Sequence, residues 1–161
     1  MDDLEDLYRE IILDHYRSPR NHGELPPPAH RTEGFNPLCG DEIILTLLVD
    51  DDRIADVRVI GHGCSISQSS ASLMTGAVKG LSVADARRSM RSFKRLMTVA
   101  EDGDLDDEDA DEPVDLRSLG ELAALQGVVK FPVRIKCATL AWNTLDQALL
   151  ELEAEHATLE G

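Results

Sequence analysis

Three cysteines and one aspartate are the residues whose types and positions could do chemistry together. The cysteines are Cys39, Cys64 and Cys137, and Asp41 lies two positions after the first of them. Each cysteine stands at a predicted boundary between elements, where backbone N–H groups and helix N-termini lower the pKa of a thiol. Because thiolates bind metals and attack sulfur, the pattern indicates either a metal site or a nucleophile.

A shared site would supply four ligands to one zinc ion. In an extended segment, positions i and i+2 point the same way, so Cys39 and Asp41 could converge on one ion. Three thiolates and one carboxylate match the tetrahedral coordination of zinc. The net negative charge of such a site could be offset by Arg134 and Lys136, just before Cys137. No two cysteines form a Cys-x-x-Cys pair, however, and spacing alone favours three unrelated core cysteines.

Composition limits what the chain can bind. With 16 Lys and Arg against 31 Asp and Glu, the 161 residues carry a formal net charge of −15. This balance argues against nucleic acid and an anionic membrane surface as partners, because both bind basic faces. An acidic N-terminus without an export signal, the lack of a long apolar run and an odd number of cysteines predict a cytoplasmic protein with reduced thiols.

Periodicity predicts the elements that must position these residues. Helical spacing of apolar residues or runs of small residues mark the predicted helices, which are 3–18, 65–79, 83–99, 115–126 and 137–156. Apolar, β-branched segments at 42–49 and 53–60 predict two antiparallel strands, and the loop over 19–40 has room for one short strand. Because helices and strands cluster separately, the pattern favours an α+β fold with a small antiparallel sheet.

Two charged segments stand out. Residues 101–112 carry nine acidic residues in twelve, from which no core can be built, so we expect a solvated loop inserted into a single domain over 1–161. An alternative is that this acidic run contacts a basic patch on a partner. The arginine-rich face of the predicted helix 83–99 is expected to pair with acids of the chain itself.

Each cysteine lies in a longer motif of its own. The motifs are Asn-Pro-Leu-Cys-Gly-Asp at 36–41, Gly-His-Gly-Cys-Ser-Ile-Ser at 61–67 and Arg-Ile-Lys-Cys-Ala-Thr-Leu-Ala-Trp at 134–142. They resemble the three cysteine motifs of the SufU proteins, within the wider IscU/NifU-N family of iron–sulfur cluster assembly. Residues 8–21 also resemble the first helix of that family and its exit. The resemblance therefore spans nearly the whole chain, in order.

The resemblance implies a fold, a site and a function. The fold is α+β, with a three-stranded antiparallel sheet, helices packed on one side and a long C-terminal helix. Cys39, Asp41, Cys64 and Cys137 are the implied zinc ligands. The implied catalytic residue is Cys39, which leaves the zinc to accept persulfide sulfur from a SufS-type pyridoxal-phosphate cysteine desulfurase. The function implied is a zinc-dependent sulfurtransferase that serves the downstream cluster assembly machinery.

Two other functions use the same residues. The first is an assembly scaffold, on which a transient iron–sulfur cluster is built at the same cysteines. IscU-type scaffolds carry His immediately before the third cysteine and a Leu-Pro-Pro-Val-Lys motif, whereas this chain has Lys136 and lacks that motif at 128–133. These departures favour the sulfurtransferase. The second is a closed structural zinc module, which poorly explains why Asp41 is a ligand instead of Cys or His.

Deletion of residues 101–112 tests the interpretation of the acidic run. If the run is a solvated loop, the deletion should change the free energy of unfolding by less than about 1 kcal/mol, because loop-closure entropy varies slowly with length. Urea unfolding of the full chain and the deletion variant measures this difference. Loss of the cooperative transition would contradict the loop assignment.

Overall fold

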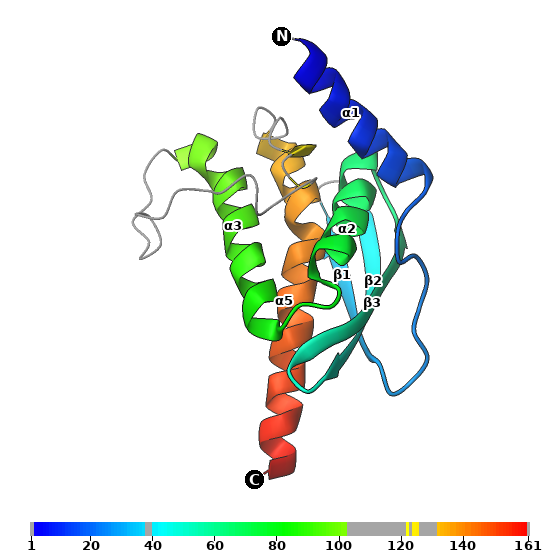
Figure 1. Cartoon of the computed structure of the whole chain (residues 1–161), viewed down its shortest axis with the longest axis vertical. Helices are drawn as coiled ribbons and strands as arrows, with labels where there is room; N and C mark the ends of the chain where they lie inside the picture. Colours follow the sequence, from blue (N-terminus) through cyan, green and yellow to red (C-terminus); the bar gives the residue numbers. More distant parts are fainter. Residues whose placement is uncertain (1, 38–39, 103–121, 123, 126–131, 161) are drawn as a thin grey trace.

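The computed structural model describes residues 2–37, 40–102, 122, 124–125 and 132–160. Within these residues the chain forms four long helices and three strands (Figure 1). In chain order they are α1 (Asp2–Arg17), β1 (His30–Asn36), β2 (Asp41–Asp50), β3 (Arg53–His62), α2 (Ser65–Val78), α3 (Val83–Asp102) and α5 (Pro132–Glu160). The α+β class expected from the sequence is confirmed, including the long C-terminal helix.

Three antiparallel strands form the sheet in the order β1-β2-β3. The two strands predicted from the sequence are β2 and β3, and the short strand expected within residues 19–40 is β1. Asp51 and Asp52 connect β2 to β3, and both have positive φ, as in the two-residue hairpin turns that match the twist of paired strands. At the opposite end of β2, Asp41 pairs with Asn36 of β1.

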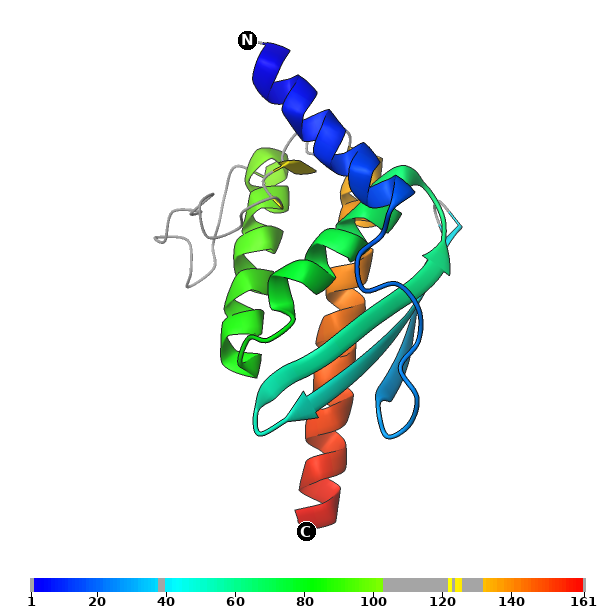
Figure 2. The ribbon, with the colours of Figure 1, turned by 45° about the vertical axis from the view of Figure 1, so that its right-hand side comes forward.

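One face of the sheet is apolar and carries the core. Side chains alternate between the two faces along a strand, and the buried apolar ones of β2 and β3 are Ile43, Leu45, Leu47, Ile54, Val57 and Val59. Helix α5 crosses this face with α2 beside it (Figure 2), while α1 packs on α2, and α3 on both α2 and α5. The helices thus pack on one side of the sheet, as the resemblance implied.

Small side chains bring α2 close to α5. The buried small residues of α2 include Ser67, Ser69, Ser70, Ala71 and Ser72. The Ser70 hydroxyl donates a hydrogen bond to the backbone carbonyl of Ala138, at 2.5 Å. Farther along α5, Trp142 stacks on Phe93 of α3 with ring centroids 5.1 Å apart. Helix α5 is therefore the element on which the sheet, α2 and α3 are all assembled, and it carries Cys137.

A polar cluster fixes the start of β1 on α5. The carboxylate of Glu151 accepts a hydrogen bond from Thr32 Oγ1 at 2.7 Å and lies 2.8 Å from His30 Nε2. Gln147 Nε2 donates to its second oxygen at 3.2 Å. These contacts, that of His30 being the strongest, lower the pKa of Glu151 to about 2. The cluster therefore joins the start of β1 to α5, at the end of the strand distant from the cysteines.

Helix α5 differs from the sequence prediction at its start. The predicted helix begins at Cys137, whereas the helix begins at Pro132. Proline is favoured in the first turn because its fixed φ is helical and its missing N–H would have no partner there. As a result Cys137 lies inside the helix and is buried, so the expectation that it stands at a boundary between elements is wrong.

The charged segments are described in part. Arg87 of α3 forms ion pairs with Asp146 at 3.5 Å and with Glu153 at 2.7 Å, as expected for that face. The acidic run begins within α3, whose last two residues are Glu101 and Asp102. The rest of the acidic run, and most of the short helix predicted over 115–126, lie outside the described residues.

Among the described residues, no helix combines the length and the apolar character needed to cross a membrane.

The polar cluster at Glu151 predicts a pH-dependent contribution to stability. Because the folded pKa of about 2 is below the ordinary value of 4.5, the contribution is present above pH 4.5 and is lost as the pH falls toward 2. Replacing Glu151 with Gln should lower the free energy of unfolding at neutral pH by about 0.5–1 kcal/mol, since the carboxylate is partly exposed. Urea unfolding across this pH range should find that the difference from wild type shrinks.

Glu33→Gln is the matched control. Glu33 forms an ion pair with Arg31, also on β1, at 2.9 Å, and the Glu33 side chain is 66% exposed. Glu33→Gln should therefore lower the free energy of unfolding less than Glu151→Gln does. An equal effect of both substitutions, or no convergence of Glu151→Gln with wild type in acid, would refute this role of the cluster.

Candidate metal centre

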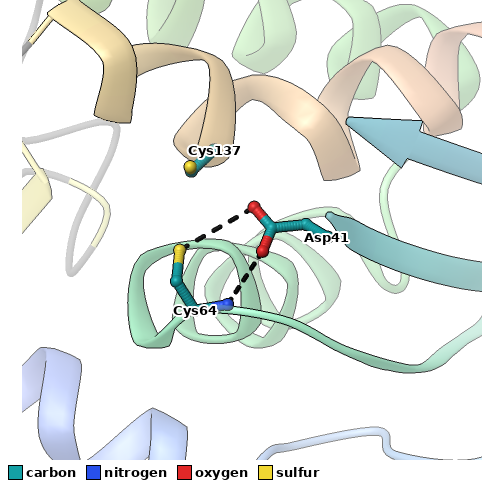
Figure 3. A group of neighbouring side chains, drawn as sticks. All are labelled: Asp41, Cys64 and Cys137. Carbon is teal, nitrogen blue, oxygen red and sulfur yellow. Dashed lines mark hydrogen bonds between the residues drawn. The ribbon is translucent and has the colours of Figure 1, made fainter. Parts of the chain in front are cut away.

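Three of the four predicted ligands meet at one end of the sheet. Asp41 is the first residue of β2, Cys64 directly precedes α2, and Cys137 lies in the second turn of α5. Their ligand atoms all lie within 4.8 Å of one another (Figure 3). Asp41 and Cys137 are fully buried, whereas Cys64 is partly exposed. The fold therefore gathers residues that are 23 or more positions apart in sequence.

The carboxylate of Asp41 is held by the backbone of Cys64. Its Oδ1 accepts a hydrogen bond from the Cys64 N–H at 2.8 Å, and its Oδ2 lies 3.8 Å from Cys64 Sγ. Gly63 makes this approach possible, because a Cβ at that position would lie 2.2 Å from Asp41 Oδ1. Gly63 also has φ +154°, a backbone conformation that residues with a side chain rarely adopt. One carboxylate oxygen is thus fixed while the other faces the thiol.

The thiol of Cys64 lies at the N-terminus of α2. Cys64 is the N-cap residue, and its Sγ accepts a hydrogen bond from the Ser67 N–H at 3.5 Å. Free N–H groups and the positive end of the helix dipole stabilise negative charge at this position. Cys64 therefore stands at the start of a helix, as the sequence predicted for this cysteine.

Two polar side chains surround the thiol pair. Asn36, 6% exposed at the end of β1, donates its Nδ2–H to Cys137 Sγ at 3.8 Å. Arg134, one turn before Cys137 on α5, has its pKa raised by the charge of the Cys64 thiol and by a hydrogen bond to it, with smaller contributions from Cys137. Of the two predicted counter-charges, Arg134 is therefore at the site. The other predicted counter-charge, Lys136, is exposed on α5.

The donor set and its spacing fit a zinc ion. Ligands that lie about 2.0–2.3 Å from a tetrahedral zinc are about 3.3–3.8 Å from one another. The 3.8 Å between Asp41 Oδ2 and Cys64 Sγ agrees with that spacing. A carboxylate and two thiols supply three ligands and leave one position for a fourth. The predicted fourth ligand, Cys39, lies outside the described residues, between Pro37 and Gly40.

Three residues of the site were not identified by sequence reasoning. Asn36, Gly63 and Ser67 each contact or position a ligand, yet none is a metal-binding residue type. The sequence does contain a signal for these residues, because all three belong to the family motifs around Cys39 and Cys64. His62, which the sequence also places near Cys64, has its Nε2 3.1 Å from Glu42 Oε2 and is exposed.

The predicted ligands lie within a recognised family pattern. The family described as NifU-like N terminal domain matches residues 7–138 of the chain, a range that includes Asp41 and all three cysteines. The resemblance noted from the motifs is therefore confirmed.

Two curated relatives align over nearly the full chain. The chain is 43% identical to the zinc-dependent sulfurtransferase SufU of Bacillus subtilis, over 93% of this chain and 94% of the relative. It is 39% identical to the iron–sulfur cluster assembly scaffold protein IscU of Streptococcus pyogenes, over 96% of this chain and 91% of the relative. The SufU crystal structure from Fervidobacterium islandicum superposes with a TM-score of 0.76 at 33% identity, and covers 87% of this chain and 94% of that one.

Substitution of Gly63 tests how the carboxylate is held. Gly63→Ala should displace Asp41, because the added Cβ would overlap Oδ1. Changes in residues that orient metal ligands typically weaken metal binding by about 10- to 100-fold, and we expect a loss of this size. Competition for Zn²⁺ against a chromogenic chelator measures it.

Gly76→Ala is the control, since a Cβ at that exposed position of α2 would meet nothing within 4 Å. It should leave Zn²⁺ affinity unchanged. Equal affinities for wild type and Gly63→Ala would contradict the role assigned to Gly63.

Proposed function

The chain belongs to the NifU-like N-terminal domain family, and from that premise we propose that it is a zinc-dependent sulfurtransferase of iron–sulfur cluster assembly. It would accept persulfide sulfur from a SufS-type cysteine desulfurase and pass it to the cluster assembly machinery. The relative named as a zinc-dependent sulfurtransferase supports this function, as does the set of ligands in the fold.

The observation that carries the proposal is the convergence of Asp41, Cys64 and Cys137. A strand, a helix cap and the interior of another helix each contribute one ligand atom, all within 4.8 Å of one another. Three unrelated core cysteines, which spacing alone favoured, would not be expected to gather two thiols around a buried carboxylate. Withdrawal of Asp41 from water is costly unless a cation or hydrogen bonds offset it.

Cys39 completes the proposed ligand set through its place in the sequence. It lies two residues before Asp41, and two residues of chain span at most about 7 Å. Asn36 and Gly40, on either side of it, are joined by a hydrogen bond from the Gly40 N–H to the Asn36 carbonyl, at 2.8 Å. A side chain on so short a connection can reach an ion bound at Asp41.

Bound at these residues, a zinc ion would keep the thiols deprotonated. The chain supplies the remaining stabilisation. The Ser67 N–H donates to Cys64 Sγ, and the Arg134 guanidinium places positive charge beside both described thiols. Three thiolates and one carboxylate around a divalent cation leave a net charge of about −2, which a nearby guanidinium reduces. Cys137, fully buried, is the anchored thiol, and Cys39 is the proposed exchangeable one.

The proposed transfer conserves atoms and electrons. The Cys39 thiolate attacks the outer sulfur of the donor's cysteine persulfide, and a new S–S bond forms to Cys39. The S–S bond in the donor breaks, and the donor's cysteine leaves as a thiolate. The proton of the persulfide stays on the transferred sulfur, and no external oxidant or reductant is needed. Such exchange requires that the attacking group be a thiolate and that it be accessible to the donor.

An assembly scaffold is the second candidate function. The IscU relative at 39% identity favours it, and the same ligands could hold iron. Position 136 favours the sulfurtransferase, because Lys136 replaces the histidine that IscU-type scaffolds carry before the third cysteine. Lysine is protonated at neutral pH and is a poor metal ligand, so it cannot substitute for that histidine.

Replacement of Cys39 with Ala tests the function. The variant should keep its far-UV circular dichroism and lose all stimulation of a SufS-type desulfurase, because the accepting thiol is gone. Turnover of the desulfurase with wild type and variant, and mass spectrometry of the peptide that contains Cys39, measure both effects. Sulfane sulfur should be found on Cys39 in the wild type.

Thr139→Ala is the control, because Thr139 lies on α5 near Cys137 and its hydroxyl donates to the Ile135 carbonyl, at 3.1 Å. It should stimulate the desulfurase as the wild type does. Full stimulation by the folded Cys39→Ala variant would exclude Cys39 as the acceptor.

A further inference from the structure

Two buried polar residues form the base of the β1–β2 hairpin. Asn36 is the last residue of β1 and Asp41 is the first of β2, and they are partners in the strand register. Asn36 is 6% exposed and Asp41 is fully buried. The four residues between them include Cys39. The two strand ends on either side of this connection therefore each place a buried polar side chain in the interior.

Each residue of this pair is bound to a different cysteine. Asp41 accepts the Cys64 N–H at 2.8 Å, whereas Asn36 donates its amide Nδ2–H to Cys137 Sγ at 3.8 Å. The carbonyl of Asn36 also accepts the Gly40 N–H at 2.8 Å, which closes the connection over its own strand end. Asn36 is thus attached both to the buried thiol and to the segment that contains Cys39.

A hydrogen bond to a metal-binding sulfur has two consequences. It orients the sulfur, because a buried amide keeps its partner rather than remain unsatisfied. It also withdraws electron density from the sulfur, as outer hydrogen bonds do at metal sites in general. Neither effect requires Asn36 to touch the metal or the transferred sulfur.

We propose that Asn36 is a positioning residue, which directs Cys137 Sγ toward the metal and anchors the connection that contains Cys39 to the same point. This inference rests on the proposed function. Asp41, Cys64 and Cys137 would then be the ligands that hold the metal independently of Cys39.

Asn36→Leu tests the inference, since leucine keeps the approximate shape of the side chain and removes the donor. Zn²⁺ affinity should fall about tenfold, the lower part of the range for outer contacts of metal ligands. In the Co²⁺-loaded variant, the sulfur-to-cobalt charge-transfer band should move to lower energy, because a sulfur without its hydrogen bond is a better electron donor. A purely structural role of Asn36 would leave this band in place.

Thr32→Val is the matched control. Thr32 is equally buried on the same strand and loses one hydrogen bond, to Glu151, at the end of β1 distant from the cysteines. It should leave the Zn²⁺ affinity and the cobalt band unchanged. If Asn36→Leu does not fold, Asn36→Ala is the second variant, because it removes the donor without adding methyl groups. The same fall in Zn²⁺ affinity and the same shift of the cobalt band are expected.

The outcomes separate this inference from the function on which it rests. Unchanged affinity and an unchanged band in a folded Asn36 variant would overturn the inference, while Cys39-dependent stimulation of the desulfurase would leave the function intact. An equal shift of the band in Thr32→Val would also overturn it. A wild-type chain that binds neither Zn²⁺ nor Co²⁺ would overturn both.

Discussion

A carboxylate withdrawn from water must be offset by hydrogen bonds, a cation or both, and Asp41 is fully buried. Its first oxygen is satisfied by the Cys64 N–H, and its second faces Cys64 Sγ at 3.8 Å. This contact joins the start of β2 to the start of α2, and it depends on Gly63 having no side chain. The rest of the site is connected to this contact. Asn36 pairs with Asp41 across the hairpin, and the Asn36 amide contacts Cys137 Sγ.

The packing of the helices on the sheet explains how ligands from three separate elements come together at the candidate metal centre. One end of an antiparallel hairpin, the cap of α2 and the second turn of α5 meet because α2 and α5 pack closely on the same face of the sheet. Small residues of α2 make that packing possible, and the Glu151 cluster fixes the far end of β1. Cys137 is held rigidly inside a helix, while Cys39 belongs to a four-residue connection. This asymmetry suits a site in which one thiol exchanges and the others remain.

Much of the fold was predictable from local pattern, because β2, β3 and α1 follow from periodicity and α2 follows from a run of small residues. The start of α5 was not, because proline is frequent in loops as well as in the first turn of a helix, so Pro132 by itself does not mark where the helix begins. Spacing alone could not join the three cysteines, since their proximity arises from tertiary packing, and only the family motifs indicated it. Arg134 was predicted as a counter-charge of the site. The contact of Asn36 with Cys137 was not, because an amide is not a metal-binding residue type and tertiary packing alone sets its partner.

The central claim is that Asp41 and the three cysteines bind zinc, and that one of these cysteines, Cys39, accepts the transferred sulfur. The measurement that tests it most directly is the content of zinc, iron and acid-labile sulfide per chain after native, anaerobic purification. The account predicts about one zinc per chain, as for a four-ligand site, with neither iron nor sulfide. Iron with matching sulfide would identify a scaffold instead, and a chain without metal would contradict the site itself.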